Sequence, residues 1–251
     1  MRDLLVSALV WGVSILLLLV LQPVFLLLLL VTAPFDPGRR VVGGLFHWVG
    51  RFLVFLCPTW DFRVENTARA PLAEPGIIVA NHQSDADVFL AACLPWEAKF
   101  LSKDSIYNLP VMGWAMRMAG DIGVVRGDKE SGAEALDACR KWVGRGVSVV
   151  IFPEGTRSRT SEMLPFYEGA FRLAVEMQRP LQPVAIAGTR DAMKPGSFLL
   201  RPARAGARIL DPVPVTGLTE EDVPALTLCV RETIEAARRA LARDLGVPEG
   251  S

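Results

Sequence analysis

The 251-residue chain has no net charge, only two histidines and only four cysteines. Its 27 Lys and Arg residues equal its 27 Asp and Glu residues, which argues against a nucleic-acid binder that depends on a basic surface. Cys57, Cys93, Cys139 and Cys229 have no short pair spacing, so the sequence contains neither a zinc pattern nor a disulfide framework. We expect these cysteines to be small buried side chains in a reducing compartment.

Charge is missing altogether from Leu4 to Ala33, a stretch of 30 residues. The chain is 51% hydrophobic with a mean hydropathy of +0.33, and this apolar excess is concentrated at the N-terminus. A helix of 30 residues is about 45 Å long, whereas the hydrocarbon layer of a bilayer is about 30 Å thick. The stretch is also longer than the apolar region of a signal peptide. We therefore predict a retained membrane anchor.

A second apolar stretch runs from Val41 to Cys57, after a turn-forming segment at residues 34–38. The pattern predicts two N-terminal helices, which fit either a kinked membrane span or a helix pair inserted in one leaflet. Arg39 and Arg40 follow the first stretch, which favours a cytoplasmic location for the rest of the chain. We assign residues 1–57 to membrane anchoring and residues 58–251 to a separate domain.

After residue 60, short apolar runs alternate with longer helical patterns, which is typical of an α/β domain. The predicted strands span residues 60–65, 76–80, 98–101, 122–126, 147–152, 182–187 and 207–210. The predicted helices span residues 85–93, 111–119, 132–143, 167–177 and 220–245. Thr219 is suited to cap the last helix, and Gly246 follows its end.

His82 and Asp87 follow the predicted buried strand at residues 76–80. Ligand sites in open α/β sheets lie at the carboxyl ends of strands, and a base that works near pH 7 is most often His. Five residues of continuous helix rotate by about 500°, so the two side chains meet only if His82 precedes the helix. Ser84 as the N-cap, with Asp87 three positions later, would provide that break. The spacing alone equally fits an Asp87 that merely caps the helix.

Three further runs of the sequence are informative, and two of them carry candidate residues. Residues 152–158 read Phe-Pro-Glu-Gly-Thr-Arg-Ser after a predicted strand, and their Gly and Arg suit a phosphate site, although a surface turn would also fit. Residues 120–126 bring Arg126 to a strand end. Residues 183–186 are apolar and, taken alone, predict a core strand.

Taken in chain order, the four runs resemble the four motifs of the glycerolipid acyltransferase family, in particular the lysophosphatidic acid (1-acylglycerol-3-phosphate) acyltransferases. His82 and Asp87 match the His-x4-Asp motif, and residues 152–158 match the third motif intact. The similarity covers roughly residues 75–190. Asp85 stands where many members have an aromatic residue, and Val125 replaces an Asp that commonly precedes Arg126. Residues beside the His and the phosphate site shape the acceptor pocket, so the identity of the acceptor stays open.

The resemblance implies an α/β fold with a mixed, largely parallel sheet flanked by helices. It implies transfer of an acyl chain from acyl-CoA or acyl carrier protein to the sn-2 hydroxyl of 1-acylglycerol-3-phosphate, which gives phosphatidic acid. In this reaction His82 is the general base and Asp87 orients it. Neither a metal nor a bound cofactor is implied.

The resemblance also implies a phosphate and acceptor site. Its residues would be Lys103, Arg126, Glu154, Gly155, Thr156 and Arg157. The same chemistry on glycerol-3-phosphate, another lysophospholipid or a lyso-aminolipid is an alternative, and an inactive lipid-binding membrane protein is a distant one. Since the substrates are membrane lipids, we expect the protein at the inner or cytoplasmic membrane, with its domain facing the cytoplasm.

Overall fold

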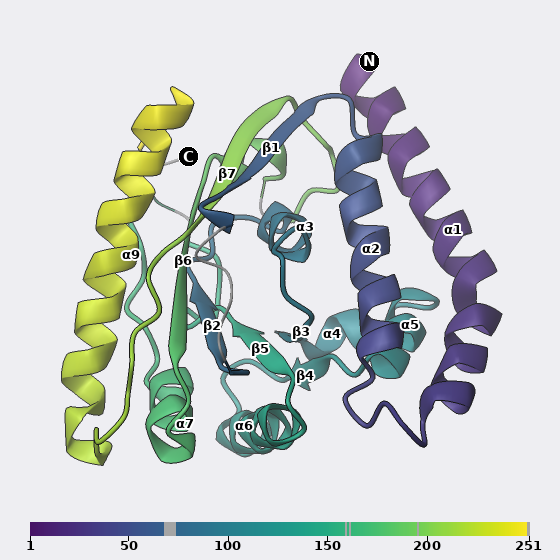
Figure 1. Ribbon diagram of the computed structural model, residues 1–251. Helices are drawn as coiled ribbons and strands as arrows, with labels where there is room; N and C mark the ends of the chain where they lie inside the picture. Colours follow the sequence, from purple (N-terminus) through teal and green to yellow (C-terminus); the bar gives the residue numbers. More distant parts are fainter. Residues whose placement is uncertain (68–73, 159, 161, 195, 250–251) are drawn as a thin grey trace.

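The computed structural model describes residues 1–67, 74–158, 160, 162–194 and 196–249, and within them it contains a seven-stranded sheet (Figure 1). The strands are β1 (Trp60–Glu65), β2 (Ile77–Ala80), β3 (Ala98–Lys103), β4 (Ile122–Val124), β5 (Ser148–Ile151), β6 (Leu181–Ala187) and β7 (Ala203–Ile209). The α-helices are α1 (Arg2–Thr32), α2 (Arg40–Leu56), α3 (Ala86–Ala92), α4 (Asp104–Tyr107), α5 (Met112–Ala119), α6 (Lys129–Gly144), α7 (Gly169–Met177), α8 (Thr189–Ala192) and α9 (Val223–Leu245).

The strands lie in the order β1-β7-β6-β2-β5-β3-β4. Neighbouring strands pair in parallel, except that β6 and β7 are antiparallel. The sheet is therefore mixed and largely parallel, as predicted. Strands β2, β5 and β6 are buried along their whole length, which explains why their sequences are apolar runs instead of alternating patterns.

Helices cover both faces of the sheet, and side chains alternate between the two cores. In β2, Ile77 and Val79 pack in a cluster with residues of α6, α7 and α9. Ile78 and Ala80 point the other way, into a cluster with residues of α3 and β7. The central strands are thus fixed from both sides, and their carboxyl ends form a rigid edge.

Every predicted strand and helix overlaps an observed element, but several bounds differ: β4 ends at Val124, before the predicted end at residue 126, and α6 begins at Lys129, before the predicted start at residue 132. The helices α4 and α8 were not predicted, because each has only four residues, which is too short for a repeating hydrophobic pattern. Strand β7 begins at Ala203, four residues before the predicted start, because residues 203–208 pair with β1. The last helix begins with a 3₁₀ turn at Glu220–Asp222, where the predicted Thr219 cap forms a capping box.

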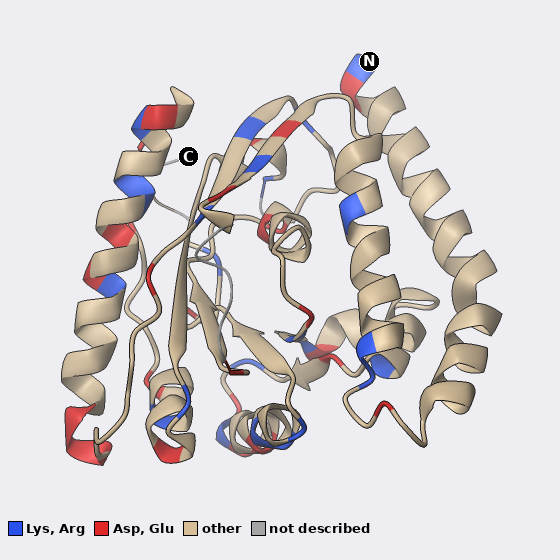
Figure 2. Ribbon diagram, in the orientation of Figure 1, with Lys and Arg blue, Asp and Glu red and all other residues tan. Residues whose placement is uncertain are grey.

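Helix α1 is the one helix among the described residues that is long and apolar enough to cross a membrane. It lies at the outside of the molecule, next to α2, and it carries no charge beyond its first turn (Figures 1 and 2). Its buried positions include Ser7, Ser14 and Thr32, whose hydroxyls donate to carbonyls one turn earlier. Leucines, in contrast, cover its exposed side.

All four cysteines are free thiols. Cys57 and Cys139 are buried, as predicted, and Cys93 is half-buried. Cys229 is exposed on α9, so the prediction of a buried side chain is wrong there.

Candidate active site

The imidazole of His82 and the carboxylate of Asp87 are in contact at the carboxyl end of β2. Nδ1 of His82 lies 2.8 Å from Oδ2 of Asp87, and both side chains are buried. Hydrogen bonding to this carboxylate favours the tautomer with the proton on Nδ1 and the lone pair on Nε2. No described residue hydrogen-bonds to Nε2. The pair therefore has the arrangement of a base and the carboxylate that orients it.

The break between strand and helix that this contact requires is present. Helix α3 starts at Ala86, so His82 precedes it, as predicted, but its N-cap is Asp85 instead of the predicted Ser84. The backbone N–H of Ser84 donates to Asp87 Oδ2 over 2.9 Å, and Ser84 Oγ accepts from Ala86 N. The Gln83 N–H also donates to Asp87 Oδ2, over 2.6 Å. Asp87 thus holds the turn before the helix and contacts the His82 ring with the same oxygen atom.

Glu154 fixes the backbone of His82 from the neighbouring loop after β5. Its Oε1 accepts from His82 N over 2.6 Å, and its Oε2 accepts from Leu164 N over 2.8 Å. Burial raises the pKa of Glu154, an effect that the two N–H donors oppose. Both carboxylate oxygens are therefore occupied by the backbone. No sequence pattern indicated this role, because Glu154 and His82 lie 72 positions apart.

The turn at Gly155 requires glycine for two reasons. Its φ is +65°, and a Cβ there would lie 2.7 Å from the ring of Tyr167. The next residue, Thr156, is exposed, and its Oγ1 accepts from Arg126 Nη1 over 3.4 Å. The second and third predicted motifs therefore meet at this turn.

Arg157 is held by an acid that the sequence prediction did not pair with it. Its Nη1 donates to Oδ2 of Asp85, two residues before Asp87. Burial lowers the pKa of Arg126, and the positive charge of Arg157 lowers it further. Lys103 ends β3 with an exposed side chain, and no described contact joins it to the two arginines.

Two further side chains support His82. Phe152 stacks on its ring, with centroids 4.4 Å apart. Asn81 donates to the carbonyl of Ile186 over 2.9 Å and accepts from its N–H over 2.8 Å, which ties the residue before His82 to β6. Both residues stand inside the predicted motifs, but neither was predicted to position the histidine.

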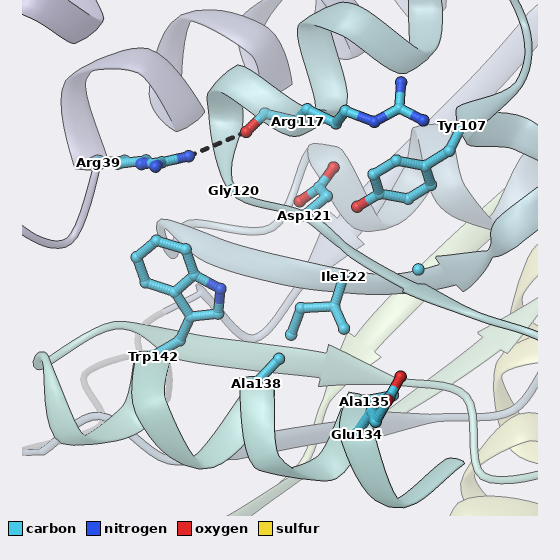
Figure 3. Close-up of a pocket in the computed structure, with 11 residues that line it drawn as sticks. Arg39, Tyr107, Arg117, Gly120, Asp121, Ile122, Glu134, Ala135, Ala138 and Trp142 are labelled. Atoms are coloured by element: carbon cyan, nitrogen blue, oxygen red, sulfur yellow. Dashed lines mark hydrogen bonds between the residues drawn. The ribbon is translucent and has the colours of Figure 1, made fainter. Parts of the chain in front are cut away.

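A cavity of about 320 Å³ lies elsewhere, between α5, β4 and α6 (Figure 3). It is lined by Arg39, Tyr107, Arg117, Gly120, Asp121, Ile122, Gly123, Glu134, Ala135, Ala138 and Trp142. None of these is a predicted site residue. Its wall carries two guanidiniums and two carboxylates, so its charge favours no particular class of ligand. Among the described residues, no group of three His, Cys, Asp or Glu side chains could hold a metal ion.

The fold and the site together define an α/β protein with a buried His–Asp pair and two arginines at one edge of its sheet. The family model described as Acyltransferase matches residues 61–187, about half of the chain. The chain belongs to the Acyltransferase family.

Relatives of this chain include 1-acyl-sn-glycerol-3-phosphate acyltransferases from plants and animals. The chain is 35% identical to a chloroplast enzyme of Brassica napus, over 75% of this chain and 54% of the relative. It is 32% identical to the alpha form of Homo sapiens, over 69% of this chain and 62% of the relative. The chain thus spans about half to three fifths of the length of these relatives.

A similar solved structure is the crystal structure of the 1-acyl-sn-glycerophosphate acyltransferase PlsC from Thermotoga maritima. It matches with a TM-score of 0.78 and 24% identity, over 94% of this chain and 96% of that chain. At this identity the match supports the fold, including the largely parallel sheet.

Proposed function

We propose that this protein transfers an acyl chain from a thioester to the sn-2 hydroxyl of 1-acylglycerol-3-phosphate, which produces phosphatidic acid. The observation that carries the proposal is the buried contact between His82 Nδ1 and Asp87 Oδ2, with Nε2 left as the basic atom. The names of the relatives support the choice of acceptor.

The reaction needs a base because an alcohol is a poor nucleophile at neutral pH. His82 Nε2 takes the hydroxyl proton as the oxygen attacks the thioester carbonyl. Asp87 holds the imidazole in the required tautomer and stabilises the imidazolium. The C–O bond forms in this attack; the tetrahedral intermediate then collapses, the C–S bond breaks, and the leaving thiolate takes the proton from His82.

The cationic residues beside His82 supply acceptor binding in this proposal. Arg157 and Arg126 bind the phosphate, because guanidinium forks match phosphate oxygens, and Lys103 adds a third positive charge. Gly155 and Thr156 form the turn next to the phosphate. Glu154 is a positioning residue, since both of its carboxylate oxygens accept backbone N–H groups.

Residues 1–57 anchor the domain to the membrane that holds both lipids, and residues 58–251 form the catalytic domain. The outward leucines of α1 support this division. We place the domain on the cytoplasmic side of the membrane, where acyl-CoA and acyl carrier protein are made.

The proposal is tested with purified full-length protein in detergent, labelled oleoyl-CoA or oleoyl carrier protein, and a panel of acceptors. We expect label in phosphatidic acid when the acceptor is 1-acylglycerol-3-phosphate. The panel also contains glycerol-3-phosphate and a lyso-aminolipid. Transfer only to an acceptor without a phosphate would contradict the proposal.

A further inference from the structure

Asp85 and Arg157 form an ion pair beside the His82 site. Arg157 Nη1 donates to Asp85 Oδ2, and the Arg157 and Asp85 side chains are 24% and 46% exposed, so solvent reaches both. The two loops that carry them are also joined at His82, whose carbonyl accepts from Ser158 N over 3.1 Å. An acceptor that presents its hydroxyl to His82 therefore places its head group near this pair.

The pair belongs to a cluster of three charges. Arg126 donates to Thr156, the residue before Arg157; burial lowers the pKa of Arg126, the charge of Arg157 lowers it further, and that of Asp85 raises it. Asp85 is thus an anion among the cations that would bind an acceptor phosphate. Asp85 would therefore affect the binding of a phosphate monoester and of a zwitterionic phosphodiester in different ways.

A phosphate monoester carries a charge of about −1.5 to −2 at neutral pH. Asp85 occupies only one N–H of the Arg157 guanidinium, so a phosphate bound to the remaining donors shares this cation with Asp85 and lies next to a second anion. Like charges at such a distance repel each other, so Asp85 weakens the binding of this head group.

A phosphodiester that also carries a primary ammonium group can bind the same pair without uncompensated repulsion from Asp85. Its phosphate takes the guanidinium of Arg157, and its ammonium takes the carboxylate of Asp85. One ion pair within the protein is exchanged for two between protein and ligand, so every charge keeps a partner.

We propose that Asp85 extends the acceptor range of the enzyme to lysophospholipids whose phosphate carries a primary ammonium group. This inference rests on the proposed role of His82, since the same step acylates either acceptor. The acceptor hydroxyl adds to the thioester carbonyl, its proton leaves through His82 to the thiolate, and the C–S bond breaks.

The test compares Asp85→Asn with the unmodified full-length protein in detergent, with oleoyl-CoA as the donor. The acceptors are 1-acyl-lysophosphatidylethanolamine, its choline analogue, which has no N–H donor, and 1-acylglycerol-3-phosphate. The amide of the variant still offers an oxygen to Arg157 but carries no charge. We expect kcat/KM to fall about tenfold for the ethanolamine lipid, to change little for the choline lipid and to rise for the phosphate monoester.

Asp61→Asn is the matched control, because Asp61 pairs with Arg63 over 3.0 Å on edge strand β1, away from His82. It removes the same charge and should leave all three rates unchanged. Equal changes for every acceptor in Asp85→Asn would overturn the inference, and so would an unmodified enzyme that acylates only the phosphate monoester. An enzyme that acylates the ethanolamine lipid but not the monoester would support the inference while contradicting the proposed phosphatidic acid synthesis.

Discussion

Helix α1 and the α/β domain differ in the side chains that they expose. In α1, hydroxyls such as those of Ser7 and Ser14 face inward, while Leu16 and Leu27 are 60% exposed. In the domain, valines and isoleucines fill both cores, and charged residues cover the helices outside (Figure 2). An outward leucine surface is unfavourable in water but favourable in lipid, which supports the proposed anchoring role of α1.

The two regions meet through charged groups as well as apolar ones. His47 of α2 is buried, with Nδ1 3.5 Å from Glu97 Oε2 and Nε2 3.8 Å from Asp121 Oδ1. Lys99, also buried, donates to Glu97 over 3.1 Å and to the carbonyl of Arg39 over 3.0 Å. Helix α2 is therefore fixed to β3 and to the start of β4, whereas α1 lies outside it (Figure 1). We therefore predict that α1 contributes mainly to membrane affinity and that α2 contributes mainly to the folding stability of the domain.

The largest expected effect concerns the outer face of α1. The triple variant Leu9→Asn, Leu16→Asn and Leu27→Asn should weaken vesicle binding by on the order of 6 kcal/mol, since each leucine side chain contributes about 2 kcal/mol in lipid. Flotation with lipid vesicles measures the bound fraction. Leu228→Asn is the control, because Leu228 is 55% exposed on α9 of the domain and should have no effect. Unchanged flotation of the triple variant would place the anchor elsewhere.

The second largest effect is expected for Asp87, which we propose to orient the catalytic base of the domain. Asp87→Asn should lower kcat by about 10³- to 10⁴-fold, because an amide favours the wrong imidazole tautomer and does not stabilise the imidazolium. Initial rates of acyl transfer in detergent measure this. Vesicle binding should stay normal, since α1 is untouched. A kcat within about tenfold of the unmodified enzyme would remove Asp87 from the mechanism.

The contact between the two regions should depend on pH. Burial disfavours the imidazolium of His47, but the carboxylates of Asp121 and Glu97 outweigh this effect and raise its pKa to about 9. Because this value exceeds the 6.5 of an unperturbed histidine, the stabilisation is fully present below pH 6.5 and is lost as the pH rises through about 9.

We therefore expect His47→Gln to cost on the order of 3 kcal/mol at pH 6 and progressively less towards pH 10. Thermal unfolding in detergent, measured for both proteins at each pH, gives the difference. A stability gap that widens with rising pH would show that the imidazolium does not hold α2 to the domain.

A smaller effect is expected for the buried carboxylate behind His82. Glu154→Gln leaves only one oxygen for the N–H groups of His82 and Leu164, so one of them loses its acceptor. We expect a loss of roughly 1–2 kcal/mol in unfolding free energy, together with a lower kcat, because His82 is held less firmly. Glu176→Gln is the surface control, since Glu176 pairs with Arg140 in solvent. Equal stability of the two variants would argue against the role of Glu154.

Much of the sheet could be predicted from the sequence because its central strands are short apolar runs followed by polar motifs. The contact between His82 and Asp87 could be anticipated as well, since the spacing leaves room for a helix start between them. Strand β7 was predicted too short because its first residues pair with β1, which lies near the other end of the domain sequence.

Contacts between distant loops could not be predicted in this way. The bond from His82 N to Glu154 and the ion pair of Asp85 with Arg157 each join residues 72 positions apart. His47 was interpreted only as part of the membrane segment.

The role of His82 as the base is tested most directly by the initial rate of phosphatidic acid formation from labelled oleoyl-CoA and 1-acylglycerol-3-phosphate. The rate is measured for the unmodified protein and for His82→Ala, with thermal unfolding and vesicle flotation as checks of fold and anchoring. We predict product from the unmodified protein and a rate lower by about 10⁴-fold in the variant, with the fold and membrane binding retained. A correctly folded His82→Ala protein with near-normal activity would contradict the proposed role of His82.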